Sequence, residues 1–122
     1  MIKPSLLTLV SGGSYAQREA AIAAFLIQHS VGQTKAVILE GLPDGAHSLA
    51  DFPSLQLHRI APGCMCCIGN LTMRVTLNRI LRHPPELLFL GLSSADHLEK
   101  IIQFLQQDAY KELLQMDQDI RL

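Results

Sequence analysis

The sequence predicts one α/β domain over residues 1–122, with a three-layer fold. We expect a mostly parallel sheet of four to five strands with helices on both faces. Short apolar runs at 6–10, 36–39 and 87–92 alternate with longer segments whose apolar residues have helical spacing. The runs are apolar throughout, which is typical of strands buried on both faces of a parallel sheet. A chain of 122 residues is long enough for one hydrophobic core.

The first half of the chain predicts a strand, a helix and a second strand. The run at 6–10 ends at Ser11-Gly12-Gly13, and Ser14 and Gln17 then have the spacing of a helix capping box. We therefore expect a helix from Ser14 to about His29. The apolar run at 36–39 is the second strand, and a polar loop follows it.

The second half continues the alternation of strands and helices. Its predicted elements are a strand at 55–60, a helix at about 70–82 that ends at His83-Pro84-Pro85, a strand at 87–92, a helix that follows the capping signal at 93–96, a short helix at about 110–114, and a tail at 116–122 that is either an edge strand or frayed. In the 70–82 helix, Arg74, Arg79 and Arg82 fall outside the apolar stripe.

Four predicted loops should meet at one edge of the sheet. They follow the carboxyl ends of the strands, at 11–15, 40–53, 61–67 and 91–96. Open α/β sheets bind their ligands at this edge, so we expect the functional site there.

Composition excludes several classes of function. The chain is 48% hydrophobic and 17% charged with a net charge of −1, which gives no reason to expect nucleic acid or an anionic membrane as a partner. We find no signal peptide and no apolar segment of membrane-spanning length. Three cysteines is an odd number at spacings unsuited to a disulfide framework, so we expect a reducing, cytoplasmic setting.

The three cysteines, Cys64, Cys66 and Cys67, lie in four consecutive positions. One loop can bring their sulfurs to a single point, and thiolates are both metal ligands and nucleophiles. They would provide three of the four ligands of a tetrahedral Zn²⁺ site, or a site for another soft divalent metal. The helix that begins after them directs its positive dipole end toward the loop, which favours thiolates.

The fourth ligand is left open by the sequence. His97 and Asp96 follow the fourth strand, and Glu40, Asp44 and His47 follow the second. Water or a second protomer could also complete the site. We take His97 forward as the candidate beside the three cysteines.

The segment Gly63-Cys64-Met65-Cys66-Cys67, placed between a strand and a helix, resembles the G-C-x-C-C loop of the CobW-type P-loop GTPases, which are metallochaperones. Residues 6–12, 36–39 and 87–94 resemble the first strand with its glycine, the second strand, and the strand that ends in E-T-T-G in that family. The resemblance implies a truncated domain, corresponding to the N-terminal part of the family's GTPase domain, that handles a transition metal.

The nucleotide motifs of the family are altered in this chain. A working phosphate-binding loop reads G-x-x-x-x-G-K-[ST], but counted from Gly12 the last three positions hold Gln17, Arg18 and Glu19. Gly91 stands at the acidic position of E-T-T-G, and no N-K-x-D segment is present. We therefore do not expect GTP hydrolysis or GTP as a cofactor, and weak nucleotide binding is left open by the sequence.

A helix N-terminus that could hold an anion remains at this turn. Gly12, Gly13 and Arg18 are the candidate residues for an anion site. The capping box satisfies the same turn without any ligand, so both interpretations stay open.

The function predicted from these observations is a non-hydrolysing CobW-like domain that binds zinc through the cysteine loop. It would buffer or sense the metal, or transfer it to an acceptor protein. Three alternatives remain: a weak nucleotide- or anion-binding GTPase-like protein, a thiol redox protein, and a non-catalytic interaction domain such as a homodimer.

Overall fold

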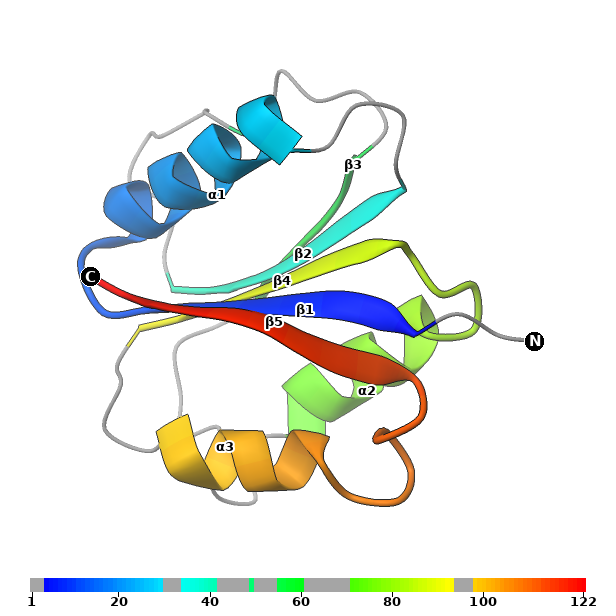
Figure 1. The fold of residues 1–122 in the computed structure, drawn as a ribbon. Helices are drawn as coiled ribbons and strands as arrows, with labels where there is room; N and C mark the ends of the chain where they lie inside the picture. The colour runs from blue at the N-terminus through cyan, green and yellow to red at the C-terminus, as the bar shows by residue number, and fades with distance from the viewer. Residues whose placement is uncertain (1–3, 30–33, 42–48, 50–54, 61–70, 94–97) are drawn as a thin grey trace.

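A computed structural model describes residues 4–29, 34–41, 49, 55–60, 71–93 and 98–122 (Figure 1). The elements in these residues are, in order, β1 (Ser5–Ser11), α1 (Tyr15–His29), β2 (Lys35–Glu40), β3 (Leu55–Ile60), α2 (Leu71–Ile80), β4 (Leu87–Leu92), α3 (Leu98–Leu105) and β5 (Leu114–Arg121). The predicted alternation of strands and helices is confirmed.

The strands form one sheet in the order β3-β2-β4-β1-β5, and all the pairings within it are parallel. β4 lies at the centre, where Leu90 is opposite Leu9 of β1 on one side and Ile38 of β2 on the other. β1, β2 and β4 are buried along nearly their whole length, as apolar runs without alternation predict.

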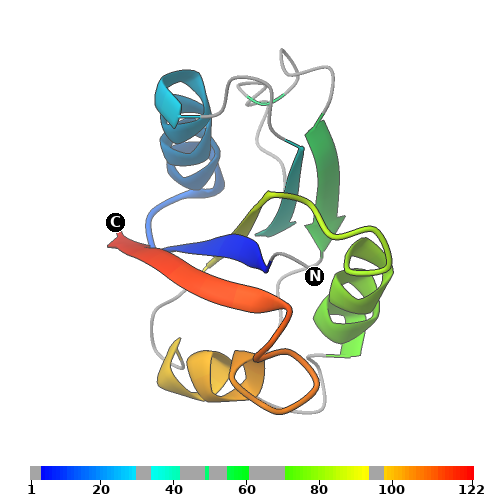
Figure 2. The same ribbon diagram turned by 45° about the vertical axis from the view of Figure 1, so that its right-hand side comes forward.

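Helices cover both faces of the sheet, which confirms the three-layer prediction. α1 lies on one face, and α2 and α3 lie on the other (Figures 1 and 2). Side chains alternate along each strand between these two faces. In β2, Val37 belongs to the core beneath α1, and Ile38 belongs to the core beneath α2 and α3.

The predicted capping box starts α1. The Ser14 N–H donates to Gln17 Oε1 at 2.8 Å, and the Gln17 N–H donates to Ser14 Oγ at 3.1 Å. These reciprocal bonds satisfy two amide groups that a helix leaves unpaired at its N-terminus. Ser14 is therefore the cap, and the helix itself begins at Tyr15.

α2 presents its apolar stripe to the sheet, as predicted. Met73, Leu77 and Ile80 are buried, whereas Arg74 and Arg79 are exposed. The Arg74 guanidinium carbon lies 5.2 Å from the centre of the Phe104 ring, beside α3. The charged side of α2 therefore faces solvent.

The short helix predicted at 110–114 is wrong. Residues 106–113 form successive turns, and Leu114 is already the first residue of β5. The chain has to reverse here so that β5 can lie parallel to β1, where the Ser5 N–H donates to the carbonyl of Leu113 at 2.9 Å. The tail is thus an edge strand, which was one of the two predicted alternatives.

In the part of the chain that the structure describes, no helix is long and apolar enough to cross a membrane.

Candidate functional site

The carboxyl ends of the parallel strands lie at one edge of the sheet, as the predicted binding edge requires. β3 ends at Ile60 and α2 begins at Leu71, so the cysteine segment connects this edge to α2. The predicted ligands Cys64, Cys66 and Cys67, and the candidate fourth ligands His97, Asp96, Asp44 and His47, lie outside the described residues. Their role as a metal site stays a prediction.

The turn between β1 and α1 is built on two glycines with left-handed backbone conformations. Gly12 has φ 82° and Gly13 has φ 62°, values that side-chain-bearing residues rarely adopt. A Cβ atom on Gly12 would lie 2.8 Å from the backbone oxygen of Leu122, whose N–H donates to the Ser11 carbonyl at 2.8 Å. The backbone of Leu122 therefore packs directly against this turn.

Arg18 lies beneath the same turn and is only 3% exposed. Its Nη1 donates to the carbonyl oxygens of Gly12 at 3.0 Å and Gly13 at 2.7 Å, and its Nη2 donates to the Glu40 carbonyl at 2.9 Å. One guanidinium thus joins the end of β1, the start of α1 and the end of β2. The three residues predicted as an anion site do lie together, but these bonds direct Arg18 to backbone carbonyls.

The Glu40 side chain links β2 to β4. It is 3% exposed, and its Oε1 accepts hydrogen bonds from the Ser93 N–H at 2.9 Å and from Ser93 Oγ at 2.5 Å. Among the candidate fourth ligands, Glu40 is the one that the structure describes. The sequence predicted Ser93 only as part of a helix-capping signal, because its contact with Glu40 depends on β2 and β4 being neighbours.

Glu19 occupies the position of the magnesium-binding hydroxyl in a working phosphate-binding loop, and it points into the protein. Its side chain is 0% exposed, and its Oε1 lies 3.6 Å from Arg59 Nη2 of β3. Neither carboxylate oxygen has a hydrogen-bond partner. Arg59 Nε donates to the Tyr15 hydroxyl at 2.6 Å. Sequence reasoning missed this cluster, because no local pattern links α1 to Arg59.

At Gly91, which stands at the position of the family's acidic residue, a Cβ atom would clash with Leu39 Cδ1, so a side chain there requires Leu39 to move. β2 packs against β4 where that acidic side chain would begin.

Among the residues that the structure describes, no three His, Cys, Asp or Glu side chains lie close enough together to hold a metal ion. The described part of this edge instead contains the buried side chains of Arg18, Glu19 and Glu40, and Glu40 accepts hydrogen bonds from the exposed Ser93.

A comparison with known proteins gives one informative similarity. Over 69 residues, 56% of its length, the chain is 39% identical to the zinc chaperone YeiR of Escherichia coli (strain K12). The chain is a partial homologue of a zinc chaperone. It spans about a fifth of the length of YeiR, since the aligned residues make up 20% of that protein. The similarity supports a CobW-like relationship. No family model matches the chain, and no solved structure matches it significantly.

Proposed function

We propose that this domain binds zinc through Cys64, Cys66 and Cys67 and does not hydrolyse GTP. The observation that carries the proposal is the cluster of three cysteines in a chain that is 39% identical over 69 residues to a zinc chaperone. Thiolates are preferred zinc ligands, and a site with three protein ligands and an exchangeable fourth position can pass its metal on. The domain buffers or senses the metal, or delivers it to an acceptor protein.

The anchoring of the cysteine segment supports the metal half of the proposal. The segment leaves the carboxyl end of β3 and enters the first turn of α2. It therefore starts from the edge of the sheet where α/β proteins bind ligands, and it leads into the N-terminus of α2, where the helix dipole favours negative charge. The edge strand β3 and the helix α2 fix both ends of the segment.

The turn at Gly12 supports the second part of the proposal, that the domain does not hydrolyse GTP. Phosphate-binding loops need a lysine that reaches the phosphates and a hydroxyl that holds Mg²⁺. In this chain Arg18 is hydrogen-bonded to three backbone carbonyls, and Glu19 is buried. The carboxylate of Glu19, at the position of the Mg²⁺-binding hydroxyl, also repels a triphosphate.

The metal half is tested by measuring zinc content and affinity in reduced protein purified without a metal-binding tag. Competition with a chromophoric chelator gives the affinity, and the variants are Cys64→Ser, Cys66→Ser and Cys67→Ser. Met65→Leu is the matched control, because it changes the same segment and leaves every thiol in place. His97→Gln tests the fourth ligand.

We expect about one Zn²⁺ per chain, or one per dimer, with affinity at least about tenfold weaker in each serine variant and unchanged in Met65→Leu. Zinc binding that all three serine variants retain would refute the cysteine site. If the domain does not hydrolyse GTP, phosphate release from GTP in the presence of Mg²⁺ should not exceed the rate without protein. Faster release would refute this part of the proposal.

A further inference from the structure

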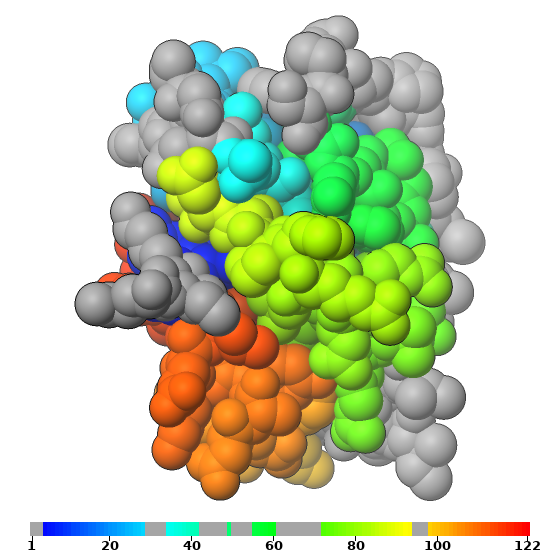
Figure 3. Space-filling view, turned by 90° about the vertical axis from the view of Figure 1, so that its right-hand side faces the viewer, coloured from blue at the N-terminus to red at the C-terminus, as the bar shows by residue number. Residues whose placement is uncertain are grey.

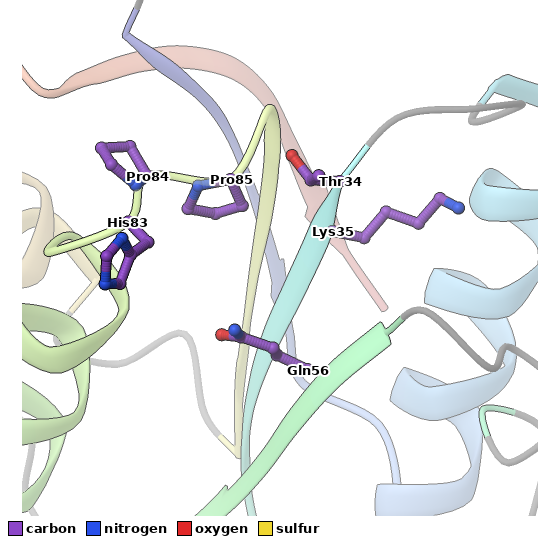
Figure 4. A pocket seen from close by; sticks show the side chains of 6 residues that line it. All are labelled: Thr34, Lys35, Gln56, His83, Pro84 and Pro85. Atoms are coloured by element: carbon purple, nitrogen blue, oxygen red, sulfur yellow. The ribbon is translucent and has the colours of Figure 1, made fainter.

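A cavity lies at the amino edge of the sheet, opposite the edge to which the cysteine segment is attached. It has a volume of about 380 Å³ and is lined by Thr34, Lys35, Gln56, His83, Pro84 and Pro85. These residues come from the starts of β2 and β3 and from the turn between α2 and β4 (Figure 4). The Gln56 amide and the His83 ring lie on the cavity side, whereas the Lys35 side chain extends away from it (Figure 4).

Hydrogen bonds hold the walls of this cavity in place. Thr34 Oγ1 accepts the Glu86 N–H at 2.9 Å, and the Thr34 carbonyl accepts the Leu87 N–H at 3.0 Å. Ser5 Oγ donates to the Pro85 carbonyl at 2.5 Å. The two consecutive prolines also restrict the backbone of the turn. The cavity is therefore formed in advance of any ligand, which lowers the entropy lost on binding.

The helix that leads to the cavity carries an unbalanced positive charge. Arg79 and Arg82 are exposed, and no residue from Leu71 to His83 is acidic. None of the ion pairs found between described residues involves these two arginines. Glu86 is the acidic residue nearest to them in the sequence. Figure 3 shows the end of α2 and the following turn on the surface of this face.

The two arginines lie next to the cavity along the chain. α2 ends at Ile80, and the turn after it has hydrogen bonds from the Arg82 N–H to the Arg79 carbonyl at 3.4 Å and from the His83 N–H to the Ile80 carbonyl at 3.2 Å. Arg82 directly precedes His83, which lines the cavity.

We propose that the cavity, together with Arg79 and Arg82, is a docking surface for an acidic segment of a partner polypeptide. One carboxylate of the segment enters the cavity and accepts hydrogen bonds from Gln56 and His83, and neighbouring carboxylates contact the two arginines. The net charge of −1 disfavours a long polyanion such as nucleic acid.

The test measures the binding of a fluorescein-labelled decapeptide of alternating glutamate and leucine by fluorescence anisotropy at low and at physiological salt. The double variant R79Q/R82Q removes the charge from the docking surface. K100Q is the matched control, because it removes an exposed charge from α3 on the same side of the sheet. Amide spectra of ¹⁵N-labelled protein locate the peptide and verify that each variant is folded. No zinc is added, so the result is independent of the cysteine site.

We expect saturable binding that shifts the amide signals of Thr34, Gln56 and His83. Binding should be about fivefold weaker in R79Q/R82Q and unchanged in K100Q, since two exposed ion pairs are lost. Equal weakening in K100Q, shifts spread over all basic regions, or no saturable binding would overturn the proposal. Tighter binding of a single-stranded oligonucleotide to the same residues would also overturn it, in favour of a nucleic-acid surface.

Discussion

Removing the guanidinium of Arg18 should destabilise the whole domain. Arg18→Met keeps most of the aliphatic stem but deletes the donors to the carbonyls of Gly12, Gly13 and Glu40, at 3.0, 2.7 and 2.9 Å. A hydrogen bond from a charged donor contributes about 1.5–3 kcal/mol, and carbonyls left buried without a partner add their own cost. Water can reach part of the emptied space, so we expect a loss of about 3–5 kcal/mol in the free energy of unfolding. Arg18→Lys keeps the charge with fewer donors and should lose about half as much.

Urea unfolding followed by far-ultraviolet circular dichroism measures this loss, since the chain contains no tryptophan. Arg82→Met is the control, because Arg82 is exposed and a surface substitution should change stability by less than about 0.5 kcal/mol. If Arg18→Met were as mild as the control, the buried guanidinium would not be holding the strand ends together. The assignment of Arg18 as an internal residue would then fail.

Three further substitutions test the packing around the same edge of the sheet. Glu19→Leu should leave stability unchanged or raise it by about 1 kcal/mol, because it removes a buried carboxylate that has no hydrogen bond, and Arg59, 39% exposed, can turn to water; a loss above about 2 kcal/mol in urea unfolding would contradict this. Gly91→Ala should cost about 1–3 kcal/mol through its clash with Leu39, and adding Leu39→Val should recover part of that loss in a double-mutant cycle. Gly12→Ala should lower the thermal midpoint by several degrees, because it combines a strained φ with a clash against backbone; an unchanged midpoint would mean that the turn can rearrange.

Patterns that act within a few residues predicted most of the fold. The reciprocal bonds of Ser14 and Gln17 and the buried stripe of α2 follow from helical spacing alone. The prediction failed at 110–114, where helix-forming residues make successive turns because the chain must re-enter the sheet beside β1. Tyr110 illustrates the reason: its hydroxyl donates to Asn78 Oδ1 at 2.8 Å, a contact 32 residues away that helix propensity does not include.

The candidate site was less predictable for the same reason. Arg18 was one candidate for an anion site at its own turn, but one of its partners is the Glu40 carbonyl, 22 residues along the chain. Glu19 meets Arg59 from β3. Such contacts depend on the order of strands in the sheet, and the alternation of strands and helices does not determine that order. The cysteine ligands, predicted from sequence alone, remain a prediction.

The central position of β4 has a consequence for how this protein is synthesised. β1 and β2 are not neighbours: both pair with β4, which lies between them. β4 begins 82 residues after the start of β1 and ends at Leu92. In a nascent chain that has emerged only as far as β3, β2 can pair with β3, but β1 has no partner strand, so both β1 and the β2–β3 pair have unpaired edges. Such edges are prone to unwanted pairing with other chains. The sheet can close only when residues 87–92 have left the ribosome, so chaperone protection should matter most during the time in which residues 60–92 are translated.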